Sequence, residues 1–439
     1  MMQVQKYLYP FQTERYERTA QRKLPCRAED EISYRIVDNG TIIPVRKIYA
    51  ENLFGSGGVL DEEGRYVLES AIASKGHIID LDNAIAPEYY VGGKGLALPE
   101  ISEKRDETVV YLGYLYNHWG HFLVDFSNRL WFAQKNINKH YHYVFVVNEN
   151  QKFEPIQPIK DFFSYLGIDD IEYISKPTFF KRIIVPEPSY ITNMYFSQLH
   201  LRLFDYIAQR AMEGCQESSY PEKVYFTRKS YKKAEQTEVG EETICQLLKN
   251  NGFSIVSPEK CTLCEQIRLI RNAKIVSGIA GTIPHNMLFA KEKQQVWIFN
   301  KTYIINTMQM DINYMRQLFI TYIDCYSCCE ARPLGGGPFL ITPTAQLCDF
   351  CKDNGIIFQY GETLERKNVR AYLNLISISE PYLPSVTQQW NSVHYFDPHL
   401  AQSFFSRFRR YIYKPDFYFR FKSNMWRALK RIKHRLGLK

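Results

Sequence analysis

Short apolar runs alternate with amphipathic stretches between residues 108 and 299, and this alternation constrains the fold more than any other feature. Apolar runs of strand length occur at 108–116, 143–148, 171–174, 182–186, 224–228, 253–257, 274–278 and 295–299. Stretches with helical spacing lie between them at 118–133, 197–212, 241–250, 259–272 and 283–290. Strands that alternate with helices form a parallel sheet with both faces covered. The sequence therefore predicts an α/β fold.

The 439 residues exceed what one such unit needs, since a domain typically takes about 100 to 200 residues. Short strands and turns, but no α/β alternation, are expected before residue 86. We therefore predict four parts: a β-rich segment at 1–85, two α/β domains at 86–215 and 216–380, and a tail at 381–439.

The tail carries most of the charge imbalance. Residues 401–439 contain 12 of the 55 basic residues and one of the 47 acidic residues, so the rest of the chain is nearly neutral. An apolar stripe is formed by Met425, Leu429, Ile432 and Leu436, with Arg427, Lys430, Arg431, Lys433 and Arg435 around it and Trp426 nearby. A basic amphipathic helix is typical of an anionic membrane surface. The same charges and aromatics also suit nucleic acid, or a solubilising tail, but we expect the membrane and no nucleic acid.

No window of about 18 apolar residues exists, so no transmembrane helix is expected. The first twenty residues contain no apolar run of the kind found in secretory signal peptides. We therefore expect a cytoplasmic protein, peripheral on the inner face of the cell membrane, with mostly reduced cysteines.

Four of the ten cysteines have the spacing of a zinc ribbon: Cys325, Cys328, Cys348 and Cys351. Against zinc, the sequence around the second pair predicts a helix with both thiols on one apolar face, whereas structural zinc sites draw cysteine pairs from tight turns. Ordinary buried thiols are the preferred interpretation, and zinc remains the alternative.

Two polar segments follow predicted strands, where open parallel sheets bind their ligands. The first contains His118, His121, Asp125 and Arg129, which a helix would place on one stripe. His121 is then a candidate general base, oriented by Asp125 one turn later. The alternative is a solvated helix face with an ordinary ion pair.

The second segment is a turn of small residues that leads from a predicted strand into a short helix. It comprises Gly278, Ala280, Gly281 and Thr282, followed by His285 and Asn286 in the first helical turn. Small residues allow close approach of a ligand, and free N–H groups at a helix start attract phosphate. The alternative is an ordinary glycine-containing turn that only connects the strand to the helix.

Three stretches together resemble one family. GHFLVDFSNRLW (120–131), VYFTRKS (224–230) and the block 250–291 resemble, in order and spacing, the motifs of glycosyltransferase family 61. Bacterial members of the family commonly belong to capsule or surface-polysaccharide synthesis, and the resemblance implies this type. The resemblance implies a two-domain GT-B fold with Rossmann-like domains. It further implies a nucleotide-sugar donor held by the C-terminal domain, inversion at the anomeric carbon, and no obligatory metal or other cofactor.

Carried over by position, the resemblance places Arg228, Gly278, Gly281 and Asn286 at the nucleotide-sugar site and His121 and Asp125 on the acceptor side. The polar stripe adds His118 and Arg129 to the acceptor side, with His121 and Asp125 as the catalytic pair. The charge of Lys229 and the helix start near Thr282, with Ala280 and His285 beside it, complete the expected donor side. Many members have histidine where this chain has Ala280, and His285 is a candidate substitute. For Arg228, an ordinary ion pair is the alternative.

We therefore expect a hexosyl- or pentosyltransferase acting on a glycan or lipid-linked acceptor. One alternative is a non-catalytic, membrane-docked component of a polysaccharide assembly complex. Another is a zinc-containing nucleic-acid-binding protein, which would leave the strand–helix pattern unexplained. The polar stripe at His121 favours the enzyme, because a scaffold has no need of it.

Overall fold

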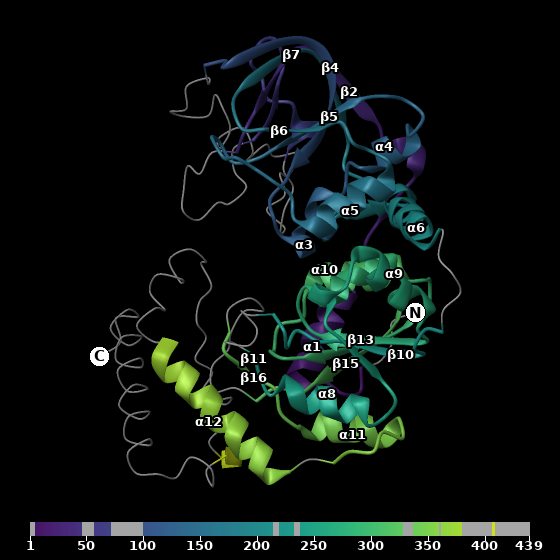
Figure 1. Cartoon of the computed structure of the whole chain (residues 1–439), viewed down its shortest axis with the longest axis vertical. Coiled ribbons are helices and arrows are strands. Elements are labelled where there is room, and N and C mark those ends of the chain that lie inside the picture. Colours follow the sequence, from purple (N-terminus) through teal and green to yellow (C-terminus); the bar gives the residue numbers. More distant parts are fainter. Residues whose placement is uncertain are drawn as a thin grey trace.

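A computed structural model describes residues 5–45, 57–71, 100–213, 219–231, 238–327, 337–359, 361–379 and 406–408. Two sheets lie at opposite ends of the long axis of the molecule, with helices between them (Figure 1). The mixed α/β architecture with parallel sheets is thus confirmed. The division into four parts and the GT-B arrangement stay predictions.

The first sheet has six strands in the order β3-β2-β7-β4-β5-β6. Their bounds are β2 (Tyr34–Ile43), β3 (Gly58–Leu60), β4 (Glu103–Tyr114), β5 (His142–Val146), β6 (Ile171–Ile174) and β7 (Thr178–Pro186). The strands β7, β4, β5 and β6 run parallel, while β2 is antiparallel to both β3 and β7. The predicted strands of this half correspond to β4 through β7.

Helices cover the side of the first sheet that faces the rest of the molecule (Figure 1). They are α3 (Trp119–His121), the π-helix η3 (Phe122–Phe126), α4 (Trp131–Lys135), α5 (Gln157–Leu166) and α6 (Gln198–Met212). A small sheet of β1 (Cys26–Arg27), β8 (Tyr190–Ile191) and β9 (Tyr195–Ser197) lies beside them, and two short 3-10 turns are η1 (Glu29–Glu31) and η2 (Leu68–Ser70). Gly167 ends α5 in the left-handed conformation, at φ 77°.

The second sheet is entirely parallel, in the order β12-β10-β13-β14-β15. Its strands are β10 (Lys223–Phe226), β12 (Ser254–Val256), β13 (Ile275–Ile279), β14 (Gln295–Asn300) and β15 (Phe319–Asp324). Around it lie α8 (Glu241–Lys249), η4 (Pro258–Lys260), α9 (Leu263–Asn272), η5 (Ile283–Phe289), α10 (Thr307–Met315), α11 (Ala345–Asp353), α12 (Glu362–Ser379) and the short strands β11 (Glu238–Val239) and β16 (Phe339–Leu340). Figure 1 shows α9 and α10 on one face and α8 and α11 on the other.

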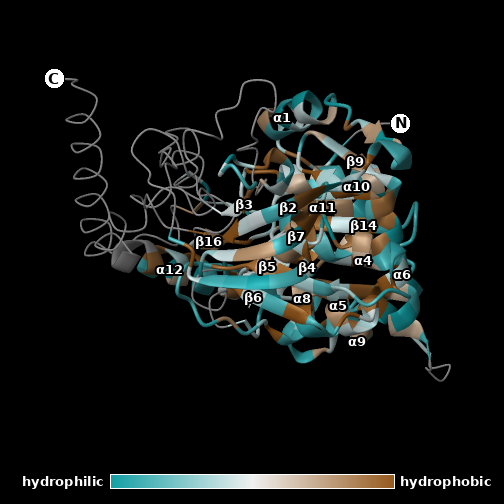
Figure 2. Ribbon diagram, turned by 90° about the horizontal axis from the view of Figure 1, so that it is seen from above, coloured by the Kyte–Doolittle hydropathy of each residue, from teal (hydrophilic) through white to brown (hydrophobic). Residues whose placement is uncertain are grey.

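Apolar side chains fill the interior of both halves. Figure 2 shows stretches of hydrophobic residues, in brown, along the strands. Large buried side chains come from both sheets, among them Tyr111, Phe145, Tyr225 and Tyr322. One continuous cluster of buried apolar residues includes members of β4, α6, η5 and α10. The two halves therefore share core residues, which keeps the segments between the sheets in fixed positions.

The N-terminal residues pack against the second sheet, far from the first. Tyr7 forms a parallel bridge with Ile323, and the Gln5 side chain pairs with the backbone of β15, accepting from the Tyr322 N–H at 2.9 Å. Helix α1 (Pro10–Ala20) follows and lies beside the second sheet (Figure 1). The chain thus begins in the half that it later completes, a long-range contact that local pattern does not reveal.

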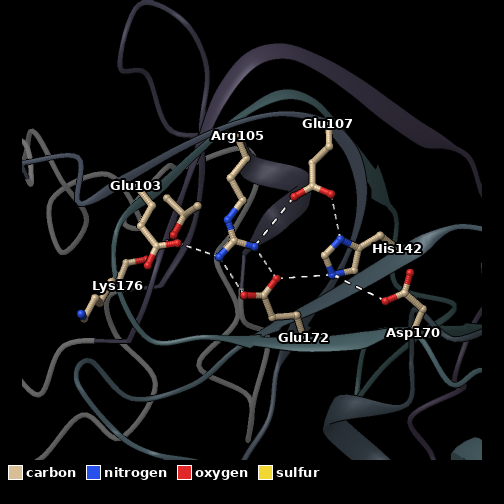
Figure 3. A network of polar contacts seen from close by, with 8 residues as sticks. Glu103, Arg105, Glu107, His142, Asp170, Glu172 and Lys176 are labelled. Carbon is tan, nitrogen blue, oxygen red and sulfur yellow. Dashed lines mark hydrogen bonds and ion pairs between the residues drawn. The ribbon is translucent and has the colours of Figure 1, made fainter.

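A network of charges joins β4, β5 and β6 near their amino ends (Figure 3). Arg105 donates to Glu172 at 2.9 Å and to Glu103 at 2.6 Å. His142 contacts Glu107 through Nδ1 at 3.0 Å and Glu172 through Nε2 at 3.3 Å. This network lies at the edge opposite the polar segments that follow the strands, so it stabilises the first sheet without entering the candidate site.

Among the residues that the structure describes, no helix is long and apolar enough to cross a membrane. The apolar stripe of the tail lies outside those residues. Only Arg407 and its neighbours are described there; Phe408 is fully buried, and Arg407 contacts Glu365 at 3.5 Å.

Candidate functional site

Three neighbouring strands of the second sheet end at one edge and present polar residues there. Arg228 lies two residues beyond β10, Gly281 two residues beyond β13, and Lys301 one residue beyond β14. Phe226 is in register with Gly278, which is in register with Ile298, so the strand ends are level. This is the edge at which parallel sheets bind ligands.

The turn after β13 has a backbone conformation that favours glycine. Gly281 has φ 142°, and a Cβ there would lie 3.1 Å from Arg228 Nη1 and 3.7 Å from Lys301 Nζ. The preceding Ala280 is buried, and its N–H donates to the Phe299 carbonyl at 2.8 Å. Gly281 therefore gives access to two cations that a side chain would obstruct.

Both cations share one carboxylate. Glu238 Oε1 lies 2.7 Å from Lys301 Nζ and 3.3 Å from Arg228 Nε. The side chains of Glu238 and Lys301 are 2% and 1% exposed, while that of Arg228 is 18% exposed. Burial lowers the pKa of Lys301 to about 8. Arg228 thus does form the ion pair that was the alternative to donor binding, with Glu238. The ion pair is buried and lies at the strand ends.

A second acid, Glu241, fixes the backbone at this edge. Its carboxylate accepts from the Arg228 N–H at 3.0 Å and from Thr227 Oγ1 at 2.9 Å. Burial raises the pKa of Glu241. Lys229 is exposed, and its own N–H donates to Thr227 Oγ1 at 3.1 Å, so its backbone rather than its ammonium group is placed by this arrangement.

His285 supports the turn from below. Its Nδ1 lies 3.0 Å from Gln309 Oε1 and its Nε2 lies 3.3 Å from Asn306 Nδ2, which together indicate a neutral ring with the proton on Nδ1. Burial lowers the pKa of His285 to about 4. The imidazole is therefore neutral at pH 7 and engaged at both nitrogens. It is not placed to replace a charged phosphate contact at Ala280.

The segment after β4 does not form the single helix predicted for 118–133. It begins as α3, with His118 Nδ1 accepting from the His121 N–H at 3.3 Å, and then widens into the π-helix η3. Ser127 Oγ donates back to the Leu123 carbonyl at 2.9 Å, a contact that competes with regular helical bonding. A π-turn is rare and frequently marks a functional site.

Within this segment, His121 and Asp125 form a close pair. His121 Nδ1 lies 2.6 Å from Asp125 Oδ2, with the two side chains 14% and 2% exposed. This contact places the proton of a neutral imidazole on Nδ1 and the lone pair on Nε2. The His118 ring lies 4.6 Å and the Tyr116 ring 5.6 Å from the His121 ring.

Arg129 does not join these residues. It is buried and donates to the carbonyls of Pro186 and Ala71, the latter at 3.0 Å, with its guanidinium 5.8 Å from the centre of the Tyr111 ring. The predicted stripe of four polar residues is therefore wrong at its last member, because the chain leaves helical geometry before it. Arg129 instead stabilises the packing behind the site.

The two polar segments meet. Trp119 Nε1–H donates to Asn286 Oδ1 at 2.8 Å, and a Cβ on Gly120 would lie 2.6 Å from Thr282 Cγ2. The segment that carries His121 and Asp125 thus packs directly on the turn that follows β13. Residues on the two predicted segments form one candidate site between the sheets.

The cysteines lie apart from this site. Cys325 is buried, and its thiol donates to the Asn300 carbonyl at 3.0 Å. On α11, Cys351 is buried but Cys348 is exposed, so the two do not share an apolar face as predicted. Cys328 lies outside the described residues. Across the described ranges, no three His, Cys, Asp or Glu side chains are grouped as metal ligands.

Sequence reasoning missed Lys301, Glu238 and Trp119. A signal existed for Lys301, because it lies two residues beyond the predicted strand 295–299, much as Arg228 lies at the end of the predicted strand 224–228. Trp119 was visible beside the two histidines but had no predicted partner. Glu238 gave no signal in the sequence. Its contacts are with Lys301, more than 60 positions later, and with Arg228 at the end of another strand.

Comparison with known proteins bears on the same residues. No curated protein matches the chain. Residues 119–297 match the family model described as Glycosyltransferase 61. The matched stretch contains His121, Asp125, Arg228 and the turn at Gly281, and it ends just before Lys301. The match supports glycosyltransferase family 61 over these residues and indicates that the protein is a glycosyltransferase.

Proposed function

We propose that this protein is an inverting glycosyltransferase that transfers a hexose or pentose from a nucleotide sugar to a hydroxyl of a glycan or lipid-linked acceptor. The observation that carries the proposal is the packing of the His121 segment on the turn after β13, through the bond between Trp119 and Asn286 at 2.8 Å. This contact sets a basic side chain beside a strand edge suited to phosphate.

In the proposed reaction, His121 Nε2 takes the proton of the acceptor hydroxyl as its oxygen attacks the anomeric carbon. Asp125, 2.6 Å from Nδ1, orients the ring and stabilises its protonated form. The bond from the anomeric carbon to the nucleotide breaks on the opposite face, so the configuration inverts. The proton ends on His121 and the negative charge on the departing nucleotide.

The departing charge is proposed to be stabilised at the donor side. Arg228 supplies a cation, and the backbone of the turn supplies close approach and N–H groups. The predicted donor-side set remains Arg228, Lys229, Gly278, Ala280, Gly281, Thr282, His285 and Asn286, with His285 as a support of the turn. No obligatory metal or other cofactor is part of the proposal.

The proposed setting is the inner face of the cell membrane, in capsule or surface polysaccharide synthesis. The basic tail supports a cytoplasmic, peripheral location, because an acceptor carried on a lipid would require the enzyme at that surface. The tail and the resemblance of the motifs are the support for this setting.

The experiment is a pair of assays on His121→Ala. We expect turnover to fall by roughly 10²- to 10⁴-fold, the usual contribution of a general base, while nucleotide-sugar affinity changes little. Thermal-shift titration against a panel of nucleotide sugars gives the affinity, and product formation gives turnover. His140→Ala, an exposed histidine in the same half, is the matched control and should behave like the native protein.

Two outcomes would contradict the proposal. If His121→Ala loses donor affinity but keeps its turnover at saturating donor, His121 binds the donor and is not the base. If the native protein binds no nucleotide sugar, the non-catalytic assembly component becomes the better interpretation.

A further inference from the structure

Two cations converge on Gly281 from the strands on either side of it. Arg228 follows β10 and Lys301 follows β14, and these strands flank β13 in the second sheet. The place where a Cβ of Gly281 would lie is 3.1 Å from Arg228 Nη1 and 3.7 Å from Lys301 Nζ. A ligand oxygen at that place would be within reach of both cations.

The two cations and the carboxylate that they share are an energetically unfavourable arrangement if their role is only structural. Lys301 is 1% exposed and the carboxylate that it shares with Arg228 is 2% exposed. A buried charge is destabilising unless it is well paired, and here one carboxylate serves two cations. The second oxygen of that carboxylate, Glu238 Oε2, is buried without a hydrogen-bond partner among the described residues. If Glu238 had only a structural role, we would expect both of its carboxylate oxygens to accept hydrogen bonds.

The edge is accessible where the two cations converge. Gly281 and Arg228 are partly exposed, whereas Lys301 is buried with its Nζ 3.7 Å from where a Cβ of Gly281 would lie. Lys301 Nζ also lies 4.7 Å from the centre of the Phe339 ring. An anion laid against Gly281 would therefore meet one partly exposed cation and one buried cation.

We infer that Lys301 is a second phosphate-binding cation, which holds a diphosphate against Gly281 together with Arg228, and that Glu238 positions both cations before the ligand arrives. The inference rests on the proposed function, because the diphosphate would be that of the donor. Two cations flanking one glycine suit two linked phosphates better than one, since each phosphate then meets its own charge.

The experiment measures binding of inorganic pyrophosphate and inorganic phosphate to the full chain by titration calorimetry. Four proteins are compared: native, Lys301→Met, Lys301→Arg and the control Lys274→Met. Lys274 is an exposed lysine at the opposite end of the same strands, paired with Glu222. It loses the same charge from the same sheet without touching the candidate site.

We expect the native protein to bind pyrophosphate at least about tenfold more tightly than phosphate. Lys301→Met should weaken pyrophosphate binding by about tenfold or more, the effect of one charged hydrogen bond, and should reduce the preference for pyrophosphate. Lys301→Arg should retain much of the preference, and Lys274→Met all of it. A native preference that survives Lys301→Met would overturn the inference, as would a native protein that does not bind pyrophosphate.

A second variant keeps the test open if Lys301→Met does not fold. Gly281→Ala keeps Lys301, Arg228 and Glu238 in the chain but puts a methyl group 3.1 Å from Arg228 Nη1, where the diphosphate would lie, so it should lose pyrophosphate binding as well. Normal pyrophosphate binding by Gly281→Ala would contradict the inference. Pyrophosphate binding requires neither sugar nor acceptor. A protein that binds pyrophosphate through Lys301 but transfers no sugar would therefore refute only the proposed function.

Discussion

Asp324 shows how strongly burial acts on single residues in this protein. It is fully buried at the end of β15 and accepts from the Tyr9 N–H at 2.7 Å and from Asn300 Nδ2 at 2.8 Å. Burial raises the pKa of this carboxyl to about 7. Asp311, which accepts from Tyr190 and from the Asn193 N–H, is shifted in the same direction, to about 6.

We predict that Asp324 makes the protein less stable as pH rises from about 4 to 7. The unfolded chain loses this proton near pH 3.9, whereas the folded protein keeps it to about pH 7. Between these pH values the folded state binds more protons than the unfolded chain. The free energy of unfolding therefore falls as pH rises, by on the order of 1 kcal/mol per pH unit. Denaturant unfolding of native protein and Asp324→Asn at pH 4.5, 6 and 7.5 (~1.5-unit steps) measures the difference.

The comparison isolates Asp324, because other titrating groups act on both proteins alike. The variant should be less dependent on pH across this range. Parallel stability curves for the two proteins would show that Asp324 is ionised throughout.

At the scale of elements, α3 packs against the turn after β13 with no room for a side chain at Gly120. We predict that Gly120→Ala lowers turnover, because its methyl group would lie 2.6 Å from Thr282 Cγ2 and push the two segments apart. Overpacking of this kind costs about 1–3 kcal/mol. Kinetic constants and thermal unfolding of Gly120→Ala, Thr282→Ser and the double variant test this as a double-mutant cycle.

Serine removes the methyl group that would collide and keeps the hydroxyl. The double variant should therefore recover part of the turnover that Gly120→Ala loses. If the two substitutions act additively, the collision is relieved elsewhere and the contact does not position the site.

The elements also show what could be predicted from the sequence. The strands of the parallel sheets were predictable, because strands buried on both faces are near-continuous apolar runs such as 295–299. The single helix predicted over 118–133 is wrong, because apolar residues on every side, including Phe122, Leu123 and Val124, conceal a π-turn. The strand β15 and helix α10 were not predicted.

The candidate site was predictable in its parts and not in its assembly. The rule that polar residues at strand ends bind ligands found His121 and Gly281, and the resemblance of VYFTRKS to the family motif found Arg228. The pairing of Trp119 with Asn286, 167 positions later, depends on how the halves pack, and nothing local encodes it. Lys301 follows the same rule as Arg228, but lysines are mostly solvated at the surface, so its position after a strand did not single it out.

At the scale of the whole molecule, we predict that the tail binds anionic membranes. Phe408 is buried and Arg407 contacts Glu365, so a chain ending at residue 408 keeps the described contacts and removes 11 of the 12 basic residues of 401–439. The full chain should sediment with anionic vesicles and the shortened chain should not. Each basic residue near such a surface contributes about 1 kcal/mol.

The controls are neutral vesicles, added salt and a single-stranded RNA. Binding to anionic vesicles should weaken with salt, because charge supplies the attraction. Equal binding to neutral vesicles would contradict an electrostatic tail, and tighter binding to the RNA would favour the nucleic-acid interpretation.

The docking of the N-terminal residues on β15 has a consequence for synthesis. Gln5 and Tyr9 are among the first described residues to leave the ribosome, yet their partners lie about 315 positions later in the chain. Contacts of such separation form late, since the intervening chain must be ordered first. The chain up to β14 therefore has to remain soluble before β15, the partner of Gln5 and Tyr9, has been made. A nascent chain arrested before residue 319 should expose this segment to proteases and chaperones.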